Sequence, residues 1–139
     1  MQRVRLAPLV AIAGCLLVVV VLAVPYLFFQ TAPGTTVDLY YGSGAVNPLV
    51  AGGLAFVATL VLAAGREERT DPLLAAGVGL ALGVFVFLIA LAWVLTVPDD
   101  VYVGISASDI GKQHRWFLAL AALVPPVASA WWARTLGVL

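Results

Sequence analysis

Long runs of apolar residues, separated by short polar segments, dominate the chain. A helix needs about 20 apolar residues to cross the hydrocarbon core of a bilayer. Four runs meet or nearly meet this length, at residues 6–29, 48–65, 72–97 and 116–136. The pattern predicts an all-α membrane protein, in which residues 1–139 form a single antiparallel bundle of four transmembrane helices.

Two of these helices are predicted to begin with the same local sequence. Asn47-Pro48 and Asp71-Pro72 each place a side chain that can accept a hydrogen bond from the first turn before a proline. Proline is favoured at the first helical position, because its missing N–H has no helical partner there anyway. Both pairs therefore mark the start of a helix.

The overall composition excludes a water-soluble domain. Hydrophobic residues make up 63% of the chain and charged residues 10%, whereas soluble domains carry about 25% charged residues. The formal net charge is zero, so a nucleic-acid partner is not expected. The expected partner is the lipid bilayer of a cell membrane.

Basic residues in the short loops predict the orientation of the bundle, since they are enriched on the cytoplasmic side. Five arginines fall on one side of the predicted spans and two basic residues on the other. This bias predicts a multi-pass protein with both termini in the cytoplasm. The first group is Arg3, Arg5, Arg66, Arg69 and Arg134, and the second is Lys112 and Arg115.

The two longer loops, which this topology places outside the cell, carry sequences typical of short strands. Residues 36–41 and 101–105 are rich in β-branched and aromatic side chains. They are predicted to pair as a two-stranded ribbon over the bundle. After the second strand, Ser106 and Asp109 have the spacing of a capping box, which predicts that the fourth helix begins near Ala107.

The stretch "SDIGKQHRWF", residues 108–117, holds the only histidine and the only lysine of the chain. We expect a water-exposed helical turn in which basic side chains pair with acids of the outer loops. Catalysis by His114 is the alternative, and it would need a carboxylate or nucleophile from elsewhere. The candidate outer-face polar cluster is Asp38, Asp99, Asp100, Asp109, Lys112, His114 and Arg115. No catalytic, metal or cofactor site is predicted, because a lone histidine offers too few ligands.

Small residues recur at every fourth position in the middle two spans. Such ridges let helix backbones approach each other closely, which drives packing where lipid supplies no hydrophobic force between helices. We expect them to pack inside the bundle, although a homodimer seam is the alternative. The ridges are Ala75, Gly79 and Gly83, and Ala51, Ala55, Thr59 and Ala63.

Pro125 and Pro126 lie midway along the fourth span. Each proline removes a backbone donor and clashes with the preceding turn. They free the carbonyls of Ala121 and Ala122 and predict a kink of more than about 20°. A structural kink is the preferred interpretation, and a substrate site at a broken helix is the alternative.

The segment "IAGC", which ends at the only cysteine, Cys15, resembles a lipoprotein processing site. The apolar run continues well beyond it and is too long for an ordinary signal peptide. We therefore predict that the first span is not cleaved, and leave open whether Cys15 is ever lipidated.

Three segments together resemble a group of small four-span haloarchaeal membrane proteins of unknown function. They are "VDLYYGSGAVNPL", "AGREERTDPLLAAG" and "HRW". The resemblance extends over nearly the whole chain and implies an archaeal cell membrane. It supplies no active residues.

No Asp, Glu, Lys, Arg or His lies in the central part of any span, and such residues mark ion paths and proton relays where they occur. The sequence therefore favours a non-catalytic scaffold or accessory subunit, which binds a membrane protein partner or itself. The alternative is a small transporter or pore, formed by oligomerisation around the fourth helix. A membrane enzyme that uses His114 comes third.

Overall fold

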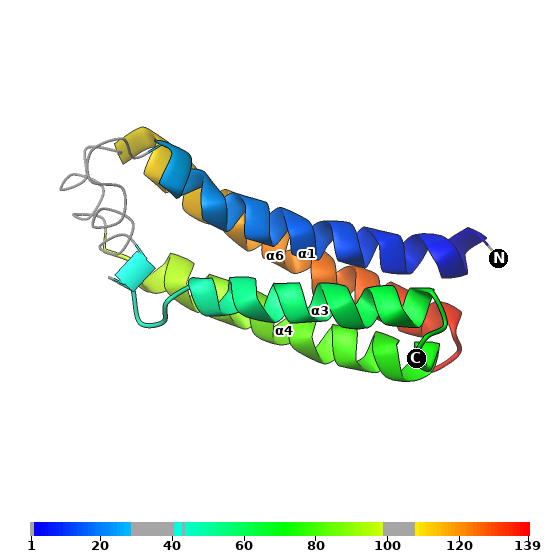
Figure 1. Cartoon of the computed structure of the whole chain (residues 1–139). Coiled ribbons are helices and arrows are strands. Elements are labelled where there is room, and N and C mark those ends of the chain that lie inside the picture. Colours follow the sequence, from blue (N-terminus) through cyan, green and yellow to red (C-terminus); the bar gives the residue numbers. More distant parts are fainter. Residues whose placement is uncertain (1, 29–40, 43, 99–107) are drawn as a thin grey trace.

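The computed structural model of the chain is a bundle of four long helices that run alternately in opposite directions (Figure 1). It describes residues 2–28, 41–42, 44–98 and 108–139. The helices are α1 (Gln2–Phe28), α3 (Leu49–Arg66), α4 (Pro72–Thr96) and α6 (Ser108–Thr135). The predicted all-α four-helix bundle is confirmed, and the described residues contain no strand.

Each helix has two neighbours, so the four form a closed ring around a common axis. Helix α1 packs against α3 and α6, and α4 packs against the same two helices. The N-terminus, the C-terminus and the α3–α4 turn all lie at one end of the bundle (Figure 1), which we call the terminal end. The opposite end is called the loop end.

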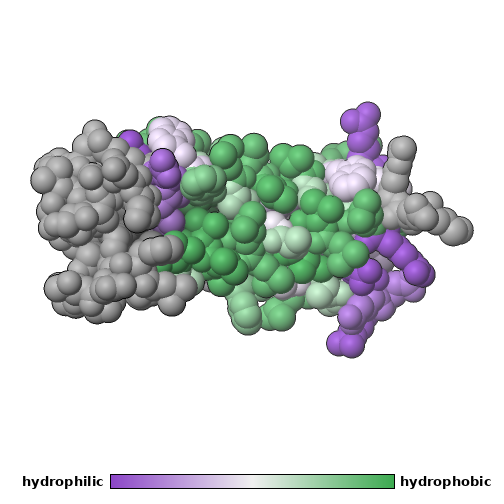
Figure 2. Space-filling model, turned by 90° about the horizontal axis from the view of Figure 1, so that it is seen from above, coloured by the Kyte–Doolittle hydropathy of each residue, from purple (hydrophilic) through white to green (hydrophobic). Residues whose placement is uncertain are grey.

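All four helices are long and apolar enough to cross a bilayer. Helix α3, with 18 residues, is about 27 Å long at 1.5 Å per residue, close to the roughly 30 Å of the hydrocarbon core. Large apolar side chains face outward along the bundle, for example Phe56 at 57% exposure and Leu120 at 64%. They form an apolar surface that ends in charged side chains at the terminal end (Figure 2).

The two predicted helix starts differ in the position of the proline. Pro72 is the first residue of α4, as predicted, and Asp71 is its N-cap. Pro48 is instead the N-cap of α3, which begins one residue later than predicted, at Leu49.

The Oδ1 atom of Asp71 accepts a hydrogen bond from the backbone N–H of Leu73 at 3.0 Å. The Oδ1 atom of Asn47 accepts one from Leu49 at the same distance. Each side chain satisfies one of the N–H groups that a helix leaves without a partner at its N-terminus. The described part of α6 begins at Ser108, directly after residues that the structure does not describe, so the predicted start near Ala107 stays a prediction.

The turn that follows α3 contains a left-handed residue that is not glycine. The N–H of Arg69 bonds to the carbonyl of Ala64 at 2.9 Å, so the chain turns back over the last helical turn. This turn requires a left-handed residue, which is usually glycine. Glu68 has that conformation, with φ of 60°, and a side chain with a Cβ is strained there.

Small residues fill the middle of the bundle. On α4, Ala75, Gly79 and Gly83 are all buried, as predicted. On α3 the prediction was only half right, because Thr59 and Ala63 are partly exposed. The buried stripe instead continues through Ala58, Leu62 and Gly65. A strict four-residue repeat drifts around a helix of 3.6 residues per turn, so burial has to alternate steps of three and four.

The larger buried side chains lie towards the two ends. Trp132 and Gly65 meet at the terminal end, where a Cβ on Gly65 would lie 3.0 Å from the indole ring. Trp93 and Tyr41 are buried at the loop end. Cys15 lies fully buried in α1 between them. The bundle is therefore closely packed along its length and closed by aromatic rings near each end.

Candidate functional site

His114, the only histidine of the chain, lies inside the loop end of the bundle. It belongs to the second turn of α6, and its side chain is only 6% exposed. The Nε2 atom lies 2.7 Å from the carbonyl oxygen of Val21 on α1. Because a carbonyl can only accept, Nε2 carries the proton and donates it. The expectation that this histidine lies on a water-exposed turn is therefore wrong.

The sequence of α1 explains why His114 is needed at this position. In a regular helix the carbonyl of Val21 would accept from the N–H four residues later. That residue is Pro25, which has no N–H. A buried carbonyl without a donor costs about 1–3 kcal/mol. The imidazole of His114 supplies the missing donor from the neighbouring helix, and so links α6 to α1.

Tyr41 makes the same kind of contact one residue further along α1. Its hydroxyl donates to the carbonyl of Leu22 at 2.5 Å, and the side chain is fully buried. The Tyr41 ring packs edge-on against Trp93 of α4, with centroids 5.4 Å apart. The His114 ring lies 6.4 Å from both of these aromatic rings. We call Tyr41, Trp93 and His114 the aromatic cluster.

The chain that follows Tyr41 is fixed against the same end of α4. The backbone N–H of Ala45 donates to Oγ1 of Thr96 at 2.9 Å, and that hydroxyl donates in turn to the carbonyl of Ala92 at 2.6 Å. Gly44 lies so close to Trp93 that an added Cβ would be 2.6 Å from the indole ring. Only glycine fits there without displacing the tryptophan.

Most of the predicted polar cluster cannot be placed. Asp38, Asp99 and Asp100 lie outside the described residues, and so do the side chains of Asp109 and Lys112. The guanidinium carbon of Arg115 lies 5.7 Å from the centre of the Trp116 ring, within the range of a cation–π contact. Ion pairs between this stretch and the outer loops thus stay a prediction.

The predicted ribbon also falls largely outside the described part of the chain. Residues 36–40 and 101–105 are not described, so their pairing stays a prediction. Tyr41, placed at the end of the first strand, is helical instead.

Helix α6 continues without interruption through Pro125 and Pro126. Both prolines are buried, and glycines of two neighbouring helices face them. A Cβ added to Gly83 of α4 would lie 2.7 Å from the backbone nitrogen of Pro126, and one added to Gly14 of α1 would lie 3.1 Å from Pro125. The prolines therefore lie at a close approach of α6 to α1 and α4, while the size of the bend stays a prediction.

The fold defines the class of protein. Four helices of membrane-crossing length, packed through small residues and covered by apolar side chains, make this an integral membrane protein. Within that class, the chain belongs to a family of unknown function, DUF7548, whose family model matches residues 1–137. The predicted membership of a family of unknown function is thereby confirmed. No curated protein and no solved structure matches the chain.

Proposed function

We propose that the protein is a non-catalytic scaffold or accessory subunit of a membrane complex. The observation that carries this proposal is the close packing of an interior without charged groups. The buried faces of α3 and α4 consist mainly of alanine and glycine, and the central part of each span lacks Asp, Glu, Lys, Arg and His. Proton relays and ion paths depend on such residues, whereas a rigid bundle that presents its outer faces to a partner does not.

The outer face of α4 offers a place for a partner helix. Gly77 and Ala81 are exposed one turn apart on this face, and a Cβ on Gly77 would meet nothing within 4 Å. Pairs of small residues at this spacing allow a second transmembrane helix to approach closely. A partner protein or a second copy of the chain could use this face.

A pull-down in mild detergent, followed by mass spectrometry of the co-purifying proteins, tests the proposal. We expect a stoichiometric membrane protein partner to be retained by the parent chain and lost from Gly77→Leu. Gly53→Leu is the matched control, because Gly53 on α3 also has nothing within 4 Å of an added Cβ. Recovery of the chain alone, as a monomer, would contradict the proposal.

The orientation and the source belong to the same proposal. The bias of arginines towards the terminal end supports a cell-membrane protein with both termini in the cytoplasm. The resemblance to haloarchaeal four-span proteins supports an archaeal membrane.

The alternative of a transporter or pore around α6 has less support. It needs water to reach the carbonyls that Pro125 and Pro126 leave free. Ala121 and Ala122, which carry these carbonyls, are buried, and Gly83 lies against Pro126 one turn further along. A pore would have to form on the outer side of α6, between copies of the chain.

A further inference from the structure

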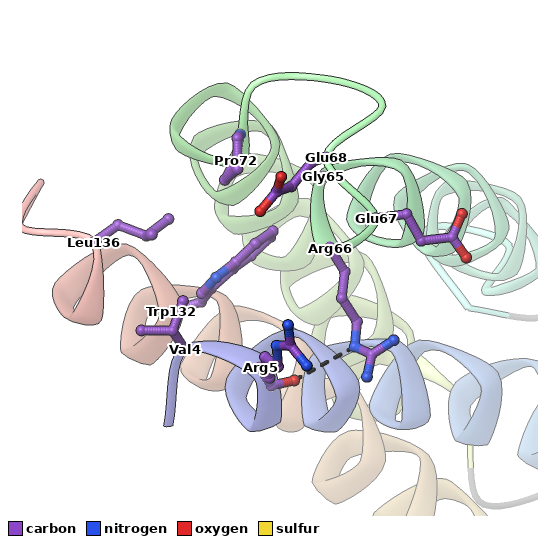
Figure 3. Close-up of a pocket in the computed structure, with 9 residues that line it drawn as sticks. All are labelled: Val4, Arg5, Gly65, Arg66, Glu67, Glu68, Pro72, Trp132 and Leu136. Carbon is purple, nitrogen blue, oxygen red and sulfur yellow. Dashed lines mark hydrogen bonds between the residues drawn. The ribbon is translucent and has the colours of Figure 1, made fainter. Parts of the chain in front are cut away.

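A cleft opens at the terminal end, where the first turns of α1 and α4 meet the last turns of α3 and α6 (Figure 3). It encloses about 840 Å³, within the usual range of about 300–1,000 Å³ for small-molecule sites. Val4, Pro72 and Leu136 line it with apolar surface, and Trp132 extends into it from α6. Arg5, Arg66 and Glu68 add charge at the rim.

The charges around the cleft do not cancel. The Nε atom of Arg66 donates to the backbone carbonyl of Arg5 at 3.4 Å, which holds the two guanidinium groups on the same side of the cleft (Figure 3). The carboxylate of Glu67 is paired with Arg69 at 3.0 Å and points away from the cleft (Figure 3). The lining includes two cations, Arg5 and Arg66, and two carboxylates, Glu67 and Glu68. Because Arg69 beside the cleft offsets Glu67, the described charges at and next to the cleft leave one surplus positive charge.

The position of the cleft sets a further condition on its ligand. It lies where the apolar surface of the bundle gives way to charged side chains (Figure 2). Its lining is apolar on one side and cationic on the other. Trp132 is 1% exposed, and its indole N–H has no acceptor among the described residues. A ligand that suits this lining has a negatively charged headgroup and an apolar tail.

We propose that the cleft binds the phosphodiester headgroup of an anionic phospholipid. The phosphate lies between the guanidinium groups of Arg5 and Arg66, and the planar fork of each arginine matches the geometry of phosphate oxygens. Basic pockets between transmembrane helices recognise lipid headgroups by this chemistry. The apolar wall formed by Val4 and Leu136 takes the glycerol backbone and the start of the chains.

The first test measures binding of dioleoyl phosphatidylglycerol to the purified chain in detergent by native mass spectrometry, with dioleoyl phosphatidylcholine as the reference lipid. We expect phosphatidylglycerol to bind more tightly, and Arg5→Gln/Arg66→Gln to weaken it about tenfold by removing two charge-assisted contacts. The matched control uses single variants: Arg66→Gln should weaken binding a few-fold, whereas Arg134→Gln, which removes the same charge from an exposed position outside the cleft, should leave it unchanged. Equal weakening by Arg66→Gln and Arg134→Gln would overturn the proposal.

A variant that binds phosphatidylglycerol more tightly than the parent cannot be misfolded, so a second test looks for tighter binding. Glu68→Gln removes the carboxylate from the cleft, so we expect it to tighten phosphatidylglycerol binding several-fold. Glu67→Gln removes the same charge from a side chain that points away (Figure 3) and should leave the affinity unchanged. The proposal fails if the two variants behave alike.

A competition experiment distinguishes a lipid ligand from a free phosphate compound. Millimolar sn-glycerol 1-phosphate carries a phosphate without acyl chains. We expect it to displace phosphatidylglycerol only weakly, because it lacks the apolar part. Full displacement would assign the cleft to a soluble phosphate compound and overturn the lipid proposal.

Discussion

Gly83 provides a sharp test of how the bundle is held together. It lies in the middle of α4 against the two prolines of α6, and Gly83→Ala adds a single methyl group there. That methyl would lie 2.7 Å from the nitrogen and 2.9 Å from the Cα of Pro126. Both are backbone atoms, so no side-chain rotation can relieve the contact and the two helices have to separate.

The magnitude follows from two opposing effects. Replacing glycine by alanine inside a helix stabilises it by about 0.8–1 kcal/mol, while overpacking a closely packed interior costs about 1–3 kcal/mol. With three backbone atoms within 3.0 Å of the new methyl, the upper part of that range applies. Gly77→Ala has the same helical gain without the clash, because nothing lies within 4 Å of its Cβ. The difference between the variants is therefore the steric cost alone, about 2–3 kcal/mol.

Reversible unfolding in mixed detergent micelles, followed by circular dichroism, measures both free energies. We expect Gly77→Ala to be more stable than the parent and Gly83→Ala to be less stable. Equal stabilisation of the two alanine variants would show that Gly83 of α4 does not lie against Pro126 of α6, and would refute the close packing of these helices.

Three further predictions address other parts of the chain. His114→Ala should lower the free energy of unfolding by about 1–3 kcal/mol, since it leaves the partly buried carbonyl of Val21 without a donor. His114→Gln, which retains an N–H, should recover part of the loss, and equal losses in the two variants would refute the hydrogen-bond role. Glu68→Gly should raise the free energy of unfolding by about 1 kcal/mol by relieving the left-handed strain, whereas Glu67→Gly, with φ of −87°, should not. Cysteines placed at Val46 and Thr70 should react with an impermeant maleimide from opposite sides of the membrane, and labelling of both in intact cells would overturn the antiparallel topology.

The helices were predictable from the sequence because the relevant physics is local. Apolar length decides which segments cross a bilayer, and a side chain before a proline decides where a helix begins. Asn47 and Asp71 show this directly, since each makes the expected contact with the residue two positions later. The end of α3 was harder to foresee, because Glu68 occupies a conformation for which no glycine is present to give a signal.

The environment of His114 was not predictable from its own neighbourhood. Charged and polar residues surround it in the sequence, which is typical of an exposed turn. Its burial depends on Tyr41 and Trp93, which come from other parts of the chain. Spacing on one helix carries no information about which rings of other helices will cover a side chain.

One signal could still have identified the partner of His114. A proline inside a transmembrane helix always leaves a carbonyl four residues earlier without its helical donor, and the bilayer offers no water to replace it. Pro25 therefore required a donor near Val21 from another helix. Antiparallel topology brings the start of the fourth helix beside the end of the first. Among the residues that begin the apolar part of α6, His114 carries a compact side chain that can donate without a fixed charge, so burial costs it less than it would cost a lysine or an arginine. A proline in one span and an isolated neutral donor at the same depth in the adjacent span form a pair that can be sought in other four-helix membrane proteins.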